Sequence, residues 1–233
     1  MKSYSQILTE GVYDQGIFKA FFMAGGPGSG KSFVTNSVTS GLGMKLVNSD
    51  VHFERMLKQV NLSLSMPDSE QYFRDMIRGR AKSLTNRQID SYVEGRLGMV
   101  VDATGRDYKI IHYQVSLLKQ LGYDCYMIFV NTSLDVAKER NKTRSRQVPE
   151  FYLVKSWETV QSNMGKFQRL FGMSNFIIVD NNKSESELVT LTMSKASKIV
   201  RQKMKAPIQS HIAKRWIARE MASRKRWNNL KNI

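Results

Sequence analysis

The segment "FFMAGGPGSGKS", Phe21 to Ser32, decides the fold of this chain. An apolar run ends at a glycine cluster, and a lysine and a serine follow directly. The eight residues from Gly25 to Ser32 fit the pattern G-x-x-x-x-G-K-[ST], in which backbone N–H groups turn inward around phosphate oxygens. Small residues are needed there because a Cβ would obstruct that approach. We therefore expect a nucleoside triphosphate site between a strand and a helix.

The residues of this loop have distinct expected tasks, with ATP and Mg²⁺ as the expected cofactors. The Lys31 ammonium is expected to reach the β- and γ-phosphates, and the Ser32 hydroxyl to occupy one position on Mg²⁺. A helix that starts near Lys31 adds its positive end to the same anion. The expected nucleotide-binding residues are Gly25, Gly26, Pro27, Gly28, Ser29, Gly30, Lys31 and Ser32.

The hydrophobic pattern predicts an α/β fold with a central parallel sheet. Continuous apolar runs are typical of strands that are covered on both faces. They occupy residues 17–24, 44–48, 98–103, 123–130 and 175–180. Stretches with helical spacing lie between them, at 32–40, 51–60, a long region to about 96, 108–121, 133–142, 150–167 and 184–205. This alternation favours strands joined by crossover helices.

The composition allows one sizeable domain with an appendage and excludes several classes of protein. The chain has 233 residues, of which 41% are hydrophobic, so a core is expected. Its longest apolar stretches are about eight residues, too short to span a bilayer. A single cysteine, Cys125, excludes an intramolecular disulfide framework and a Cys-based zinc site.

The net charge of +16 is concentrated near the C-terminus. From Lys195 onward there are twelve Lys or Arg and one acid, Glu220, which points to a polyanionic or phosphate-rich partner. We expect Pro207 to separate the phosphate-loop domain over 11–205 from a basic amphipathic helix over 206–233. Its apolar stripe would begin with Ile208, Ile212 and Trp216. Three roles stay open for this helix: docking on the sheet, non-specific nucleic-acid contact by its outward face, and binding to a membrane surface.

Further candidate residues follow the expected strands, where ligands bind in open α/β sheets. Asp50 comes after one strand, and Asp102, Thr104 and Arg106 come after another. The alternative for Asp50 is that it caps the next helix. Arg140, Arg144 and Arg146 lie in "ERNKTRSRQVPE". They form either a solvated charged face or a lid that folds over the γ-phosphate.

Taken together, the glycine loop, Asp50, "DATGR" at 102–106, "LLKQLGYDCYMIFV" and the arginine segment resemble the zeta-toxin kinases and their polynucleotide-kinase-like relatives. The resemblance covers about residues 18–180 and implies a five-stranded parallel sheet and ATP-dependent phosphoryl transfer. It implies that Asp50 accepts the proton of the acceptor hydroxyl. It further implies that Arg140 and Arg146 act with Lys31 on the moving phosphoryl group, and that Asp102, Thr104 and Arg106 bind a sugar nucleotide.

The sequence departs from that family where the acceptor would bind. Asp102 stands where the family has glutamate, Ala103 replaces a glycine, and the two arginines are more closely spaced. The acceptor is therefore open between a sugar nucleotide, a nucleotide and a 5′-hydroxyl polynucleotide. A polynucleotide kinase would lack the phosphatase that accompanies some such enzymes, because no D-x-D-x-T motif occurs. A nucleoside monophosphate kinase shares the loop, and a DNA-binding virion protein with auxiliary nucleotide binding is the non-enzymatic alternative.

The N-terminal segment "MKSYSQILTEG" resembles the capsid-targeting leaders of internal head proteins in T-even-like bacteriophages. Such leaders are cut after a Leu/Ile-x-Glu motif, which Leu8-Thr9-Glu10 fits. The resemblance implies a cleaved leader over residues 1–10 and a location in the cytoplasm of a bacterial host or inside a phage head. The alternative from composition alone is a frayed terminus.

Overall fold

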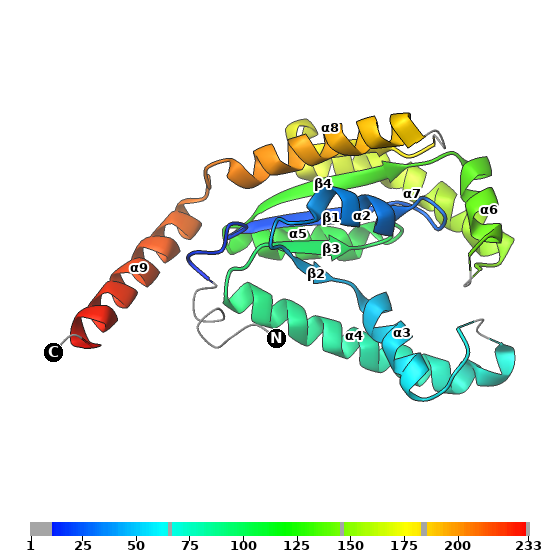
Figure 1. The fold of residues 1–233 in the computed structure, drawn as a ribbon, viewed down its shortest axis with the longest axis horizontal. Coiled ribbons are helices and arrows are strands. Elements are labelled where there is room, and N and C mark those ends of the chain that lie inside the picture. The colour runs from blue at the N-terminus through cyan, green and yellow to red at the C-terminus, as the bar shows by residue number, and fades with distance from the viewer. Residues whose placement is uncertain (1–10, 65–66, 145–146, 183–185, 232–233) are drawn as a thin grey trace.

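The computed structural model describes residues 11–64, 67–144, 147–182 and 186–231, and it contains one parallel sheet (Figure 1). The strand order is β2-β3-β1-β4-β5, and every neighbouring pair is parallel. The expected five-stranded parallel sheet is thus confirmed. Four strands are slightly shorter than their apolar runs, and β4 is shifted by one residue. The strands are β1 (Lys19–Ala24), β2 (Lys45–Val47), β3 (Met99–Asp102), β4 (Asp124–Asn131) and β5 (Phe176–Asp180).

Helices cover both faces of the sheet. Side chains of α2 and α8 pack on one face, and side chains of α5, α7 and the start of α9 pack on the other. No described helix combines the length and the hydropathy needed to cross a bilayer. The helices are α2 (Lys31–Thr39), α3 (Ser49–Gln59), α4 (Gln71–Glu94), α5 (Tyr108–Gln120), α6 (Leu134–Lys142), α7 (Glu150–Phe171), α8 (Ser186–Lys205) and α9 (His211–Lys231).

The central strand β1 explains why the sheet forms here. All six of its residues are buried. Phe21 and Met23 belong to the cluster under α2 and α8, whereas Ala20 and Phe22 belong to the cluster under α5 and α7. Successive side chains of a strand point to opposite faces, so a continuous apolar run contributes to both cores. The loop that follows Ala24 therefore starts from a strand that is buried on both faces.

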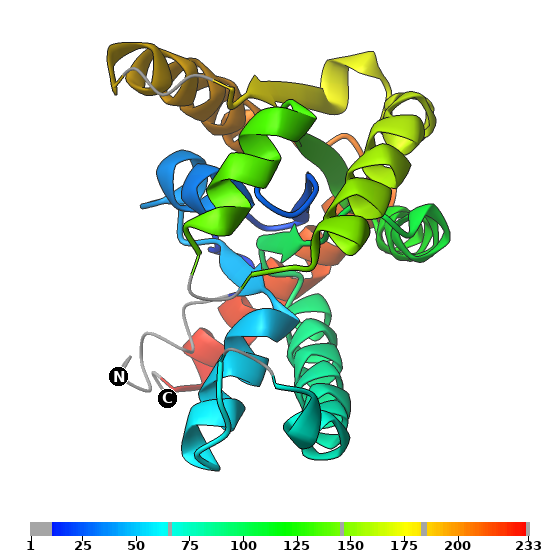
Figure 2. The same ribbon diagram turned by 90° about the vertical axis from the view of Figure 1, so that its right-hand side faces the viewer.

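Helices α3 and α4 form a hairpin with a small core of its own. Phe53 and Leu57 of α3 pack on Ile77 and Ala81 of α4. Figure 2 shows this hairpin below the carboxyl ends of the strands, with α6 and the start of α7 above them. These two projections border the edge of the sheet at which parallel strands present their ligand-binding loops.

The C-terminal helix α9 leaves the opposite, amino-terminal edge of the sheet (Figure 1). The Trp216 ring packs edge-to-face on Phe18 at 5.5 Å between ring centroids, and Ala213 is fully buried. The expected apolar stripe is wrong at Ile212, which is 42% exposed. The helix begins only at His211, so Ile208 lies before it and the buried face shifts to Ala213, Trp216 and Ile217.

A buried lysine fixes the connection between α8 and α9. Lys19, at the start of β1, is only 2% exposed. Its Nζ donates to Asp124 Oδ2 at 2.7 Å and to the Ala206 carbonyl oxygen at 2.9 Å. A buried ammonium is costly unless it is paired and hydrogen-bonded, and these two partners meet that need. The bend at Ala206 is therefore tied to the first residues of β1 and β4.

We predict that Lys19→Met lowers the free energy of unfolding by about 1–3 kcal/mol, because Asp124 and the Ala206 carbonyl each lose a charged donor. Urea denaturation followed by circular dichroism measures the change. Lys109→Met, at an exposed position of α5, is the matched control and should shift stability by less than about 0.5 kcal/mol. Equal stability of the two variants would contradict the role of Lys19.

Candidate phosphate-binding site

The glycine loop after β1 is held in place by the ends of the neighbouring strands. The Ser29 carbonyl oxygen accepts hydrogen bonds from Asn181 Nδ2 at 2.7 Å and Thr132 Oγ1 at 3.2 Å. The Gly25 N–H donates to the Thr104 carbonyl oxygen at 3.0 Å. These partners follow β5, β4 and β3 respectively, so three strand ends position one loop. Figure 2 shows α6 on one side of the loop and α7 on the other.

The loop backbone adopts conformations and contacts that only glycine accommodates. Gly28 has φ +77°, and a Cβ there would collide with the backbone of Ala137 in α6. Gly30 is the N-cap of α2 with φ +80°. Behind the loop, the Trp157 indole N–H donates to the Thr132 carbonyl oxygen at 2.7 Å. A Cβ on Gly26 would lie 3.4 Å from Trp157 Cα. The loop is thus packed closely between α6 and α7.

A cavity of about 290 Å³ lies over the loop and contains two arginines. Arg140 and Arg144 reach it from the end of α6, and Arg140 Nη1 also donates to the Asn181 carbonyl oxygen at 2.8 Å. Arg146 lies outside the described residues. Arg144 was expected only as one of three arginines in a solvated face or a lid, and the family resemblance gives it no separate task. The signal available in the sequence was its place in the same arginine-rich run, directly after the helix that carries Arg140.

Burial and neighbouring charges perturb the two ionisable groups beside the loop. The Lys31 Nζ donates to the Gly25 carbonyl oxygen at 2.6 Å. Burial lowers the pKa of Lys31, whereas the charge of Asp102 raises it and that of Arg144 lowers it. Burial raises the pKa of Asp102. The positive charge of Lys31 lowers this pKa, and the negative charge of Asp50 raises it. Lys31, Asp50 and Asp102 therefore form one electrostatic group at the carboxyl ends of β1, β2 and β3.

A second cavity, of about 360 Å³, lies where β2 and β3 end. Of the expected acceptor residues, Asp102 and Thr104 line it, whereas Arg106 is exposed and does not. The backbone at Gly105 and Arg106 is held instead by Asn163 Nδ2, which donates to both carbonyl oxygens. Sequence reasoning missed the wall that α4 contributes, because no motif marks it: Lys82, Thr85, Asn86 and Ile89.

Asp50 does not cap helix α3. Asn48 is the N-cap, since its Oδ1 accepts from the Asp50 N–H at 2.8 Å, while its Nδ2 donates to Asp102 Oδ2 at 2.7 Å. The Asp50 carboxylate, 49% exposed, is paired with Arg78 Nη1 of α4 at 2.5 Å. The Arg78 guanidinium lies over the Phe53 ring at 3.6 Å. Asp50 itself lines neither cavity, although its neighbour Ser49 lines the second one.

The loop fits a polyphosphate with Mg²⁺. The Ser29 Oγ is buried inside the loop and, among the described residues, has no hydrogen-bond partner. Ser32 lines the same cavity as Lys31. Mg²⁺ is commonly held by few protein oxygens together with substrate phosphates, so one hydroxyl beside a phosphate cradle is a suitable donor set. The described part of the chain contains no cluster of three His, Cys, Asp or Glu that could hold a metal ion.

Residues 21–166, more than half of the chain, match the AAA domain family. The chain belongs to the AAA domain family. No curated protein sequence matches it. The match begins inside β1 and ends inside α7, so it contains the loop, both cavities and the two arginines. The P-loop kinase character expected from the sequence agrees with this assignment.

Solved structures share the fold of this AAA domain at low sequence identity. A putative kinase from Chloroflexus aurantiacus aligns with a TM-score of 0.53 and 14% identity, over 80% of this chain and 96% of its own. The AvrRxo1-ORF1:-ORF2 complex, solved with ATP, aligns with a TM-score of 0.54 and 15% identity, over 76% and 61%. The PezAT toxin–antitoxin system of Streptococcus pneumoniae aligns with a TM-score of 0.50 and 13% identity, over 80% and 87%. These likenesses show a P-loop kinase-like fold.

We predict that Gly28→Ala weakens ATP binding at least about tenfold, because the added methyl group would push the loop away from Ala137. Gly43→Ala is the matched control. Gly43 has a similar φ of +69° but open space around its Cα, so that variant carries the backbone strain without the collision. Calorimetric titration with Mg²⁺·ATP measures both. Equal affinities of the two variants would show that the contact with α6 does not shape the loop.

The charge of Lys31 should be detectable in the titration of Asp102. We predict that Lys31→Met raises the pKa of Asp102 further, because the nearest cation that favours the carboxylate is removed. Carbon-13 NMR of the side-chain carboxyl groups measures the change. Lys58→Met, at the far end of α3, is the control and should leave the pKa of Asp102 unchanged. An unshifted Asp102 in the Lys31 variant would place the two groups too far apart to interact.

Proposed function

We propose that this AAA domain is an ATP-dependent kinase that transfers the γ-phosphoryl group to a hydroxyl of a nucleotide or sugar nucleotide. One observation carries the proposal. A phosphate-loop cavity and a second polar cavity both open at the carboxyl ends of the strands, and the Lys31–Asp102 pair stands between them. Phosphoryl transfer requires two such sites, one for the donor and one for the acceptor.

The donor side is built from backbone amides and three cations. The amides of Gly25–Ser32 would hold the β- and γ-phosphates, and Lys31 would leave the Gly25 carbonyl to bind them. Ser32 would hold Mg²⁺, which when bound neutralises charge on these phosphates. Arg140 and Arg144 line the loop cavity and would stabilise charge that develops on the moving group. The resemblance assigns the stabilisation of the moving group to Arg140 and Arg146 rather than to Arg140 and Arg144, and the role of Arg146 stays a prediction.

The acceptor side would use Asp50 as the base. Its carboxylate is oriented by the ion pair with Arg78, near the positive end of helix α3. A general base must come within hydrogen-bond reach of the proton that it removes. The acceptor hydroxyl would therefore approach at the Ser49 side of the second cavity. Asp102 and Thr104, with Lys82 and Asn86 of α4, would bind the rest of the acceptor, and the predicted role of Arg106 would require it to act from outside this cavity.

The alternatives differ in what they require of other parts of the chain. A basic tail beside the active site would favour a 5′-hydroxyl polynucleotide kinase, but α9 leaves the sheet at the edge opposite the loop (Figure 1). Such an enzyme would have to hold its oligonucleotide with residues around the second cavity. A packaged phage-head protein rests on the N-terminal resemblance alone, and that leader, residues 1–10, lies outside the described residues.

The test is phosphoryl transfer from Mg²⁺·ATP to a panel of nucleosides, nucleotides, sugar nucleotides and 5′-hydroxyl oligonucleotides. We predict transfer to one member of the panel, and a fall in kcat of about 10²–10⁴-fold for Asp50→Asn with ATP affinity unchanged. Asp75→Asn, on an exposed position of α4, is the matched control and should keep wild-type activity.

Two results would overturn this proposal at different points. Full activity of Asp50→Asn would remove Asp50 as the base while leaving the kinase in place. Tight ATP binding without transfer to any acceptor would instead favour a binding protein with auxiliary nucleotide binding.

A further inference from the structure

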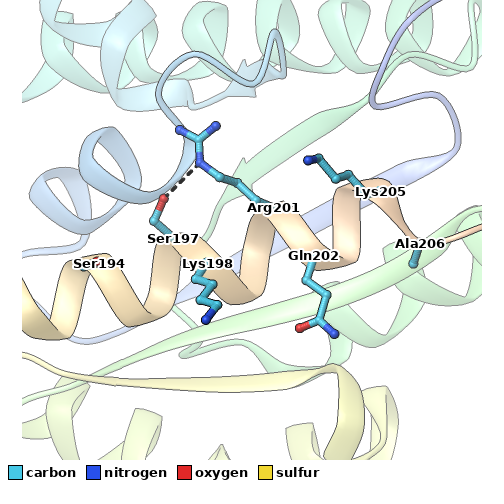
Figure 3. Close-up of a pocket in the computed structure, with 7 residues that line it drawn as sticks. All are labelled: Ser194, Ser197, Lys198, Arg201, Gln202, Lys205 and Ala206. Atoms are coloured by element: carbon cyan, nitrogen blue, oxygen red, sulfur yellow. Dashed lines mark hydrogen bonds between the residues drawn. The ribbon is translucent and has the colours of Figure 1, made fainter.

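The outer face of α8 carries a groove of about 740 Å³ that belongs to neither cavity of the proposed active site. Figure 3 shows the Arg201 and Lys205 side chains extending to one side of the helix and those of Lys198 and Gln202 to the other. The lining residues recur at helical spacing along one face: Ser194, Ser197, Lys198, Arg201, Gln202, Lys205 and Ala206.

This face is fixed in its orientation by the packing of the opposite side of α8. Met193, Ala196, Val200 and Met204 are buried against the sheet. The bend that follows α8 is held by Lys19, which donates to the Ala206 carbonyl oxygen. The groove residues therefore point to solvent from a rigid helix, rather than from a segment that could turn its cations elsewhere.

The cations of this groove are not neutralised by neighbouring acids. Within the described residues, Lys198, Arg201 and Lys205 have no ion pair, and Arg201 Nε donates only to Ser197 Oγ, at 3.4 Å. The one acid in α8, Glu187, lies in its first turn, about three to five turns away from them. An uncompensated stripe of this kind attracts a polyanion.

We propose that the outer face of α8 binds the phosphate backbone of nucleic acid. The helix rises about 1.5 Å per residue, so Lys198, Arg201 and Lys205 span roughly 10 Å, enough to contact successive phosphates. The Ser194, Ser197 and Gln202 side chains add neutral donors of the kind that position a phosphate backbone. The groove lining contains no large apolar side chain, whereas a membrane-binding helix needs an apolar face to insert.

Nucleic acid bound here would be a partner and not the acceptor. The groove lies on the α8 side of the sheet and ends at the bend near its amino-terminal edge, whereas the phosphate loop follows the carboxyl end of β1 (Figure 1). The cations of α9 begin just after the bend and extend the same charge. Binding at α8 therefore tethers the protein to nucleic acid without filling either cavity. It does not depend on which acceptor the kinase uses.

The test is fluorescence anisotropy with labelled single-stranded and duplex oligonucleotides, between about 50 and 200 mM salt. For the triple variant Lys198→Ala, Arg201→Ala and Lys205→Ala we expect affinity to fall at least about tenfold. The slope of log K against log salt should become shallower by about 2–3, since each lost phosphate contact removes about 0.7–0.9. Transfer from ATP to a small acceptor should be unchanged.

The matched control removes the same charge from exposed positions elsewhere: Lys58→Ala, Lys109→Ala and Lys155→Ala. An equal loss of oligonucleotide affinity in the two triple variants would show that net charge alone causes the effect, and it would overturn the proposed site on α8. A third triple variant, Lys214→Ala, Arg215→Ala and Arg219→Ala, tests α9. If this variant lost affinity while the α8 variant kept it, the contact would lie on α9 and the proposal would be overturned. Binding of the wild-type protein to anionic vesicles but to neither oligonucleotide would also overturn the proposal.

Discussion

The close contact between the glycine loop and its surroundings is the constraint on which the rest of the structure depends. Gly28 has room only for a hydrogen beside the Ala137 backbone, and Gly26 lies against Trp157. The Ser29 carbonyl oxygen is held from the ends of β4 and β5. A polyphosphate cradle needs amides that already point inward before the ligand arrives. The sheet order supplies this, because β1 lies between β3 and β4 and each neighbour contributes one restraint.

The two cavities are coupled through charge. Lys31 moderates the pKa of Asp102, and Asp102 in turn moderates that of Lys31. A polyphosphate that draws Lys31 away from the Gly25 carbonyl would also change the field at Asp102, on the wall of the second cavity. Asn48 connects the same group to Asp50, because its side chain bonds both the Asp102 carboxylate and the Asp50 N–H. The two cavities thus share one polar network at the ends of three strands.

Much of the fold could be predicted from the sequence because its signals are local. The run Lys19–Ala24 is buried on both faces, and the loop pattern follows it directly. The second cavity was only half predictable. Asp102 and Thr104 follow a strand and could be placed at its end, but Lys82 and Asn86 reach the cavity only because the α3–α4 hairpin packs through Phe53 and Leu57. Long-range packing of this kind leaves no spacing signal. The same holds for Ile212, whose exposure depends on where α9 starts, and for the pairing of Asp50 with Arg78.

The position of Trp157 has a consequence for observing the molecule. Its indole is hydrogen-bonded beside the loop, whereas Trp216 lies at the other edge of the sheet and Trp227 further along α9. The fold therefore carries a natural optical probe at the site where the nucleotide's charge would arrive. Emission from that one fluorophore can follow occupancy in real time without any attached dye, while Trp216 at the opposite edge of the sheet contributes a steady background.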